Sequence, residues 1–266
     1  MRIVVCIKQV LDPSAVNNYA LAGNLRIAAD GRTLDVQAIP RLINAYDEQA
    51  LEAALRLRDA GCECRITAVS IGRDLQDPLK HCAALGADEI VAIEAKAETL
   101  DHHVVANILA AYIRSSGGAD LVLCGRQASD DDQGVVPALI GEALGLPIAS
   151  LARAIELVDG ARLRVTRVTT DGDEIIEGAL PAVVTVSNEL GEPRFPSARD
   201  KMAARKKVPL DISVASLGLS DAELTPRVVL AKQYIPEIHG HCEFIEGTPA
   251  EAAQLLFEKL RADKLL

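Results

Sequence analysis

LVLCGRQASDDDQGVVPALIGEALGLP, residues 121–147, is the stretch that decides the fold. It opens with an apolar run, Leu121–Cys124, that has the length and β-branched content of a buried strand. The chain then breaks at Gly125 into a polar loop that runs to Gly134, and apolar residues follow at helical spacing until Gly145. Open α/β sheets use this order of strand, glycine, loop and helix to hold a ligand at the carboxyl ends of their strands. The loop contains no nucleophile–base pair, so we predict a binding loop.

The helix after this loop has an N-terminus that a carboxylate can cap, and Asp132 is the expected capping region. The free N–H groups of the helix would then face the loop. A structural explanation is also available, because carboxylates before a helix N-terminus are favourable through the helix dipole alone. Taken alone, the loop leaves a binding role and a plain acidic turn equally open.

The chain before residue 121 alternates strands with helices. The predicted strands are Arg2–Val10, Arg65–Ile71 and Glu89–Ile93, and the predicted helices are Glu48–Ala60, Leu75–Leu85 and Asp101–Ile113. This alternation predicts a doubly wound, mostly parallel α/β sheet with right-handed crossovers. Residues 11–43 have an irregular pattern, with room for a small hairpin between Leu25–Ala28 and Thr33–Val36.

After Pro147 the pattern changes to short runs between Asp-Gly turns. We expect these runs to be antiparallel strands that extend the sheet: Leu151–Val158, Arg162–Thr170, Glu174–Ala179 and Ala182–Ser187. A polar loop to Leu210, an extended arm from Asp211 to His241 and a helix capped by Thr248 should follow. We therefore divide the chain into an α/β domain, residues 1–190, and an appendage, residues 191–266.

The composition narrows the function classes. The chain has 266 residues, of which 49% are hydrophobic and only 3% aromatic, which suits a parallel sheet built from Val, Ile, Leu and Ala. A net charge of −10 argues against nucleic acid as the main partner. The six cysteines show no paired framework, the first apolar run is too short for a signal peptide, and no segment has the length of a membrane span. We expect a cytoplasmic protein.

Other motifs favour structural explanations. Residues 116–120, SGGAD, resemble the pyrophosphate loop of ATP pyrophosphatases, but they precede a strand, so no helix N-terminus would face a phosphate. Neither GxGxxG nor a P-loop is present. His239, His241 and Cys242 with Glu237 and Glu243 could be drawn as a metal site, yet no second cluster supports it, and we predict no metal site. We assign no catalytic residue.

Several segments, in this order, resemble the β subunit of electron transfer flavoproteins across nearly the whole chain. They are VCIKQVLD (5–12), NAYDEQALEAALRLRDAG (44–61), AVSIG (68–72), ALGADE (84–89), GRQASDDDQG (125–134), LPAVVTVSNELGEPRFPSA (180–198) and MAARKK (202–207). The segment before Pro181 is similar to the family's signature, although Thr170 stands where the pattern has an acidic residue. The matching positions are Arg167, Asp171, Gly172, Glu174, Ile176, Pro181, Val183 and Val184.

The resemblance implies an αβ heterodimer. Its redox FAD is held mainly by the α subunit, with the β subunit covering one side, and the β subunit buries a second nucleotide, which is AMP or a second FAD. The positions that match this second pocket are Cys6, Asn44, Ala45, Tyr46, Asp47, Ile71, Gly72, Gly125, Gln127, Asp130, Asp132, Gln133, Gly134, Val135, Val136 and Pro137.

The resemblance also suggests roles. Backbone groups around Cys6 and Ile71 would contact the adenine edge. Gln127, Asp130 and Asp132 would hold the loop or the ribose. N–H groups after Gln133 would take the phosphate, and Tyr46 would lie toward the flavin of the α subunit.

Departures from the family pattern leave two points open. Ala45 replaces a common Pro, and Val135 and Pro137 replace a common Gln and Gly of the phosphate turn, so the choice between AMP and FAD stays open. Residues 192–202 match the loop by which the family docks acyl-CoA dehydrogenases, but Ala198 replaces its anchoring leucine. The dehydrogenase partner is therefore open too. The predicted docking residues are Arg194, Phe195, Ala198, Arg199 and Met202.

The resemblance thus implies an electron-carrier subunit rather than an enzyme. It would shuttle electrons from flavin dehydrogenases, such as acyl-CoA dehydrogenases, to an acceptor, with residues 191–266 contacting the α subunit. One alternative is a bifurcating flavoprotein subunit that oxidises NADH. Another is a stand-alone adenine-nucleotide hydrolase or sensor, which would need a carboxylate–metal or Lys–phosphate arrangement that the sequence does not show.

Overall fold

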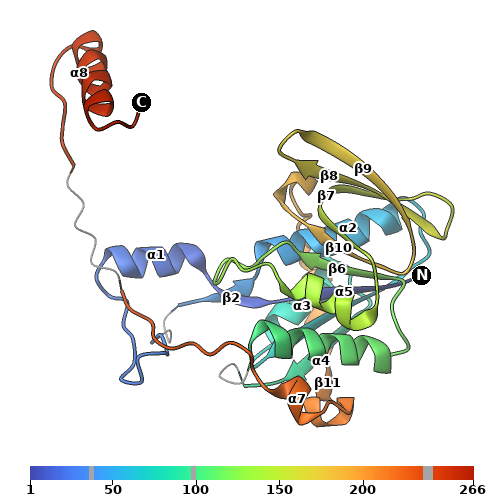
Figure 1. Cartoon of the computed structure of the whole chain (residues 1–266). Helices are drawn as coiled ribbons and strands as arrows, with labels where there is room; N and C mark the ends of the chain where they lie inside the picture. The colour runs from blue at the N-terminus through green and yellow to red at the C-terminus, as the bar shows by residue number, and fades with distance from the viewer. Residues whose placement is uncertain (36–38, 97–99, 236–241) are drawn as a thin grey trace. The chain divides into compact units, whose positions relative to one another are not determined.

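The computed structural model describes residues 1–35, 39–96, 100–235 and 242–266. The chain divides into two compact units, Met1–Gln233 and Tyr234–Leu266. Within the described residues the first unit holds a nine-stranded sheet of order β11-β5-β4-β1-β6-β10-β7-β8-β9 (Figure 1). Its strands are β1 (Arg2–Ile7), β4 (Arg65–Gly72), β5 (Glu89–Glu94), β6 (Leu121–Gly125), β7 (Ile148–Leu157), β8 (Arg162–Thr169), β9 (Gly172–Ala179), β10 (Ala182–Val186) and β11 (Leu210–Ser213).

The centre of the sheet is parallel, as the alternation of strands and helices predicts. Strand β1 lies between β4 and β6, and Val5 is in register with Ala68 on one side and Leu123 on the other. These strands are apolar along their length because both faces of the sheet are covered. The predicted doubly wound α/β class is confirmed.

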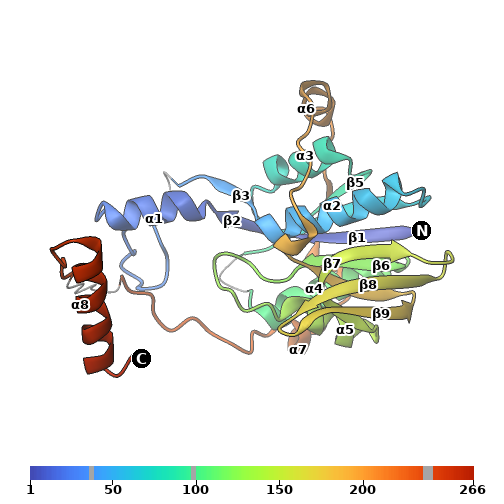
Figure 2. The ribbon, with the colours of Figure 1, turned by 90° about the horizontal axis from the view of Figure 1, so that it is seen from above.

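Helices cover the two faces of this sheet (Figure 2). Helices α2 (Ala45–Asp59) and α3 (Gln76–Leu85) pack on the face that carries Ile3, Val5 and Ile66. Helices α4 (His102–Ser115) and α5 (Val136–Leu144) pack on the face that carries Val4, Val69 and Val122. Burying each such side chain contributes roughly 1.5–3 kcal/mol, so the carboxyl ends of the strands are held on a rigid base.

The expectation of four antiparallel strands after Pro147 is wrong for one of them, β10. Strand β10 lies inside the sheet and pairs parallel with both β6 and β7. Only the pairs β7–β8 and β8–β9 are antiparallel, so the predicted hairpin extension is confirmed at the edge of the sheet. Val183, Val184 and Val186 are fully buried, which is the continuous apolar run of a parallel strand. The two Asp-Gly turns before this strand led to the expectation of one more antiparallel strand.

Two further segments have more structure than the sequence predicts. The expected arm from Asp211 begins inside β11, which pairs parallel with β5, and continues through η3 (Val214–Leu217) and α7 (Asp221–Leu224). The expected polar loop before it contains η2 (Asn188–Leu190) and α6 (Ala198–Ala204). These elements are too short for hydrophobic periodicity to be detected.

The N-terminal region predicted to be irregular also contains regular elements. They are β2 (Gln9–Leu11), which pairs antiparallel with β3 (Arg41–Ile43), and α1 (Pro13–Leu21). The small hairpin forms as a bridge between Ile27 and Leu34, although its predicted end at Val36 lies outside the described residues.

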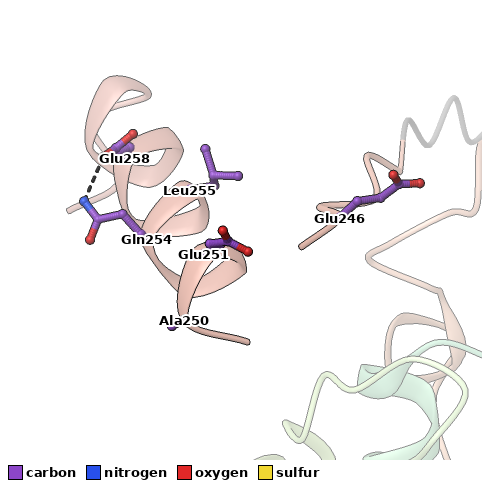
Figure 3. A pocket seen from close by; sticks show the side chains of 6 residues that line it. All are labelled: Glu246, Ala250, Glu251, Gln254, Leu255 and Glu258. Atoms are coloured by element: carbon purple, nitrogen blue, oxygen red, sulfur yellow. Dashed lines mark hydrogen bonds between the residues drawn. The ribbon is translucent and has the colours of Figure 1, made fainter. Parts of the chain in front are cut away.

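The second unit is built on α8 (Pro249–Ala262), the helix predicted from its capping signals. Thr248 and Glu251 form a capping box, and Pro249 stands at the first helical position. The adjacent hollow has three glutamates, Glu246, Glu251 and Glu258, among the residues that line it (Figure 3). In the part of the chain that is described, no helix has the length and hydropathy to cross a membrane. The functional division at residue 190 stays a prediction.

Candidate functional site

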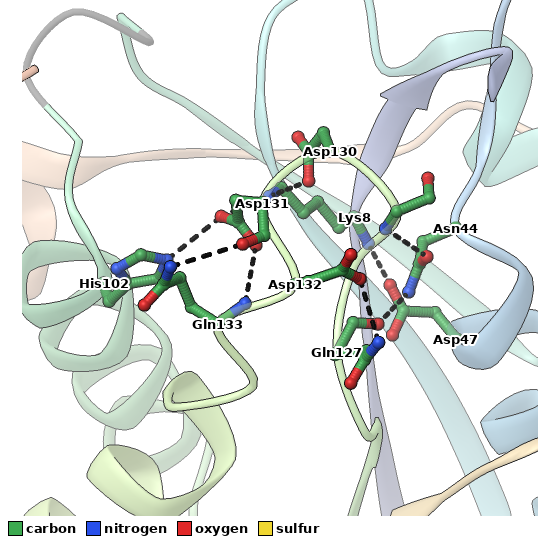
Figure 4. A network of polar contacts seen from close by, with 10 residues as sticks. Lys8, Asn44, Asp47, His102, Gln127, Asp130, Asp131, Asp132 and Gln133 are labelled. Carbon is green, nitrogen blue, oxygen red and sulfur yellow. Dashed lines mark hydrogen bonds and ion pairs between the residues drawn. The ribbon is translucent and has the colours of Figure 1, made fainter. Parts of the chain in front are cut away.

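The candidate site lies where β1, β4 and β6 end and α2 begins. The residues after β6, 126–134, form what we call the acidic loop, and it reaches back over the ends of these strands (Figure 4). Parallel strands place their carboxyl ends on one edge, so segments far apart in sequence meet here.

Asp47 joins α2 to two of the strands. Its Oδ2 accepts the Lys8 backbone N–H at 2.8 Å, and its Oδ1 accepts the Gly125 backbone N–H at 2.9 Å. Burial raises the pKa of Asp47 to about 7, although the bonds from these two N–H groups favour the ionised form. The carboxyl group is therefore occupied in holding the floor of the site.

Gly125 is required by the same contact. A Cβ at this position would stand 2.7 Å from the Cβ of Tyr46 and 2.8 Å from its carbonyl carbon, and closer still to the Asp47 carboxylate. Every other residue would push the first turn of α2 off the end of β6.

Asn44 anchors the acidic loop. It stands at the N-cap position of α2, but its side chain does not cap that helix. Its Nδ2 donates to the Gln127 carbonyl oxygen at 2.8 Å, and its Oδ1 accepts the Ser129 N–H at 3.3 Å. Asn44 is almost completely buried, so the loop is held from below by two amide hydrogen bonds.

The acidic loop also closes on itself. Gln127 Nε2 donates to Asp132 Oδ1 at 2.8 Å, and Asp132 adopts a left-handed φ of 52°. Gly134 has φ 63°, and a Cβ there would stand 2.8 Å from the Arg126 carbonyl oxygen. The prediction that the Asp132 region caps α5 is wrong, because the residue turns inward to Gln127. Val135 is the N-cap, and no side chain caps α5, which leaves N–H groups of its first turn for another acceptor.

The outer side of the loop is tied by charged groups that the sequence did not reveal. Lys8 Nζ lies 2.6 Å from Asp130 Oδ1 and 3.2 Å from Asp131 Oδ2, and His102 Nε2 lies 3.0 Å from Asp131 Oδ2. Burial works against ionisation of both Lys8 and Asp131, but their polar partners prevail. Asp130, and after it Asp131, raises the pKa of Lys8, while the bond to His102, and after it Lys8, lowers the pKa of Asp131. The only hint of these ion pairs in the sequence was a lysine directly after a predicted buried strand.

The remaining predicted site residues lie along the strand ends. Cys6 hydrogen-bonds to the Cys124 thiol on the neighbouring strand, and this bond together with burial raises the pKa of Cys124. Ile71 and Gly72 end β4, and the preceding Ser70 has a buried Oγ without a hydrogen-bond partner. Tyr46 is half-buried, with the Arg126 guanidinium carbon 5.6 Å from its ring centroid.

Not every predicted residue has a contact that supports a role. Asp130 faces Lys8, while Gln133 bonds within the loop to Asp131. Ala45 and Val135 are exposed, Val136 is half-buried, and Pro137 is buried in the first turn of α5. All sixteen positions stay predictions as cofactor contacts.

The predicted docking residues are brought together elsewhere, around α6. Phe195 is 92% exposed and Met202 68% exposed, and the Arg199 side chain is exposed as well. Ala198 begins the helix. Arg194 differs from them, because its guanidinium is paired with Glu52 and Asp59 on α2.

The acidic loop presents groups of the kinds that bind ligands in other proteins. It offers backbone N–H groups, amides and carboxylates held by the fold. Among the described residues, no group of three or more His, Cys, Asp or Glu is placed to hold a metal ion, and His239 and His241 lie outside those residues.

Comparisons with known proteins show the family of the chain. The family model described as "Electron transfer flavoprotein domain" matches residues 32–217. The electron transfer flavoprotein subunit beta of Thermoanaerobacterium thermosaccharolyticum is 34% identical over 98% of each chain. That of Megasphaera elsdenii is 32% identical over 84% of this chain and 82% of its own. The caffeyl-CoA reductase-Etf complex subunit CarD of Acetobacterium woodii is 32% identical over the full length of both. The chain therefore belongs to the electron transfer flavoprotein family, among its β subunits.

Proposed function

We propose that this chain pairs with an α subunit as a soluble, cytoplasmic electron transfer flavoprotein. The heterodimer carries electrons from a flavin dehydrogenase to an acceptor through FAD held mainly by the α subunit. The observation that carries the proposal is the acidic loop, fixed by Asn44 in front of the uncapped N-terminus of α5. In this role the chain has no catalytic residue. It provides one side of the flavin site, a nucleotide site and a docking surface.

The residues present fit an adenine nucleotide. N–H groups in the first turn of α5 offer the positive end of a helix dipole to a phosphate. The unpaired Ser70 Oγ adds a buried polar atom near the end of β4. Gln127 and Asp132 would hold the ribose side, and backbone groups near Cys6 and Ile71 the base. The hollow beside α8 is unsuitable, because its glutamates would repel a phosphate.

The FAD of the α subunit, when bound, supplies the electron-carrying chemistry. This chain's contribution is to cover the flavin and to exclude water with Tyr46 and Arg126 at the rim. Exposed apolar side chains support an α-subunit contact at two places. Val228 and Val229 are exposed in the first unit, and Leu255, Leu256 and Phe257 are exposed on α8 in the second. Apolar surface of this kind marks an interface.

The decisive test is to coexpress the chain with an α subunit of the family, purify the complex and extract its nucleotides. We expect a stable heterodimer that contains one FAD and one adenine nucleotide in the β site. AMP there supports simple electron carriage. The proposal would be refuted if the chain formed a heterodimer with none of the α subunits tested. It would also be refuted if the heterodimer never retained a nucleotide in its second site.

A second FAD would instead favour the bifurcating alternative, in which the complex oxidises NADH. Val135 and Pro137 replace the Gln and Gly that are common in the family's phosphate turn, so the sequence leaves the choice between AMP and FAD open. Anaerobic NADH oxidation by the purified complex distinguishes the two. Turnover of ATP or AMP by the chain alone would support the hydrolase alternative.

A further inference from the structure

The segment that leads to the docking residues is clamped to α2. We call residues 190–194 the strap, because they leave η2 and cross the side of that helix. Glu52, Arg56 and Asp59 lie on one face of α2, since residues separated by three or four positions are neighbours on a helix. All three bind the strap.

Glu52 is the centre of the clamp, with a side chain only 6% exposed. Its Oε2 accepts the Arg194 Nε–H at 2.7 Å and the Arg194 backbone N–H at 3.2 Å. Its Oε1 accepts Arg194 Nη2 at 3.2 Å and Arg56 Nε at 2.9 Å. One buried carboxylate therefore receives four donors from two arginines. Charge-assisted bonds of this kind are strong and fix orientation.

Arg56 and Asp59 complete the clamp. Arg56 Nη1 donates to the Leu190 carbonyl oxygen at 2.6 Å, and its Nη2 donates to the Glu192 carbonyl oxygen at 3.1 Å. Arg194 Nη2 also reaches Asp59 Oδ2 at 2.6 Å. The strap is thus held through its backbone as well as through its arginine.

The docking segment beyond the strap, residues 195–206, has little burial of its own. Within α6 only Ala204 is buried. At the far end, Lys207 Nζ donates to the carbonyl oxygens of Ala87 and Asp88 at 3.0 and 3.2 Å. Polar contacts at both ends, together with the packing of α6 against α3, therefore fix a segment most of whose side chains face solvent. Such a segment loses less conformational entropy when a partner binds.

We propose that Glu52 is a positioning residue for partner docking, because its carboxylate sets the base from which Phe195 and α6 project. This inference rests on the proposed docking of a flavin dehydrogenase by residues 195–206. Glu52 itself does not touch the partner. Its effect passes through Arg194 and the strap.

The test uses the αβ complex with a purified acyl-CoA dehydrogenase and its acyl-CoA as electron donor. Glu52→Gln keeps the shape but removes the charge, and Phe195→Ala tests docking directly. Glu48→Gln is the matched control, because Glu48 is on the same helix but contacts His81 instead of the strap. Steady-state rates give kcat and the KM for the complex, and hydrogen exchange measures protection of the Arg194 N–H.

We expect Glu52→Gln to raise KM about tenfold and to speed hydrogen exchange of the Arg194 N–H about tenfold. The value of kcat and the exchange rate of the Gly125 N–H should stay unchanged. Phe195→Ala should raise KM similarly, and the double variant should add little because both changes act on one contact. Glu48→Gln should change neither quantity. Arg56→Gln, at an exposed position that releases the strap carbonyls, should repeat the effect if Glu52→Gln does not fold.

Failure of the inference and failure of the proposed function are distinguishable. If Phe195→Ala leaves KM unchanged, the proposed docking surface is wrong, and the role of Glu52 is lost with it. If Phe195→Ala raises KM while Glu52→Gln or Arg56→Gln does not, docking stands and the positioning role is refuted. A rise in KM without faster Arg194 exchange also refutes it, because the strap would then not be the route.

Discussion

Two carboxylates on α2 occupy opposite electrostatic environments, although both are almost completely buried. Asp47, in the first turn, meets two neutral backbone N–H groups, and its pKa rises to about 7 because of burial. For Glu52, burial likewise opposes ionisation, but hydrogen bonds from Arg194 and Arg56 prevail and lower the pKa. The comparison shows that the partners of a buried carboxylate decide its charge. The helix thus has one joint at the acidic loop, where the carboxyl group ionises only near pH 7, and a charged joint at the strap.

The strongest test of this comparison is the pH dependence at Asp47. A folded-state pKa above the unfolded value of about 3.9 means that stability from the protonated group is full below that value and is lost as pH rises toward 7. The free energy of unfolding of the wild type, minus that of Asp47→Asn, should fall by about 1.4 kcal/mol per pH unit, or about 4 kcal/mol in all.

Urea unfolding of both proteins between pH 4 and pH 8 measures this difference, and subtraction removes the other titrating groups. The difference should be level above pH 7. A difference that stays constant or grows with pH would show that Asp47 is ionised in the fold, stabilised by its two N–H donors, and the contrast with Glu52 would disappear.

Gly125→Ala tests the close approach of β6 and α2 at the Asp47 joint. The new Cβ would collide with Tyr46 and Asp47, so we expect a loss of about 3 kcal/mol in the free energy of unfolding. Gly178→Ala, in β9, is the control, because a Cβ there meets nothing within 4 Å. Thermal unfolding of both variants checks the prediction. Equal stability of the two would mean that α2 moves freely away from β6.

At the charged joint, Glu52→Gln should cost about 2 kcal/mol at pH 7. This is less than for a fully enclosed pair, because Arg194 and Arg56 reach solvent. The sign with pH is opposite to that of Asp47. A lowered folded pKa means that the stability is present above the unfolded value of about 4.3 and is lost as pH falls through the folded pKa. Urea unfolding from pH 7 down to pH 3 should show the wild type converging on the variant. A gap that persists at pH 3 would assign the loss to packing.

The sequence predicted the part of the fold in which local pattern and burial agree. The strand at Leu121 is a continuous apolar run and the helix from Ala45 has strong periodicity, and both stand within a few residues of the expected bounds. Strand β11 was missed because its edge position leaves most of its four residues exposed. Asp47 and Asn44 were named from family resemblance, but their role as anchors depends on contacts across tens of residues. The roles of Lys8, Glu52 and Arg56 were not predicted. Glu52 and Arg56 are four positions apart on one helix, but their partners in the strap, like the partners of Lys8 in the acidic loop, become neighbours only in the folded chain.

The smallest expected effect concerns the exposed ties on the outer side of the acidic loop. Lys8→Gln removes the ion pairs to Asp130 and Asp131, but all three side chains are more than one-third exposed, so the free energy of unfolding should fall by about 0.5 kcal/mol or less. The loss should vanish at high salt, where exposed charges are screened, whereas the loss at Glu52 should largely persist. Urea unfolding in low and in molar salt measures both. The buried bonds of Asn44 and Asp47 still hold the loop in this variant, so a large, salt-independent loss would mean that Lys8 rather than α2 is the main anchor of the loop.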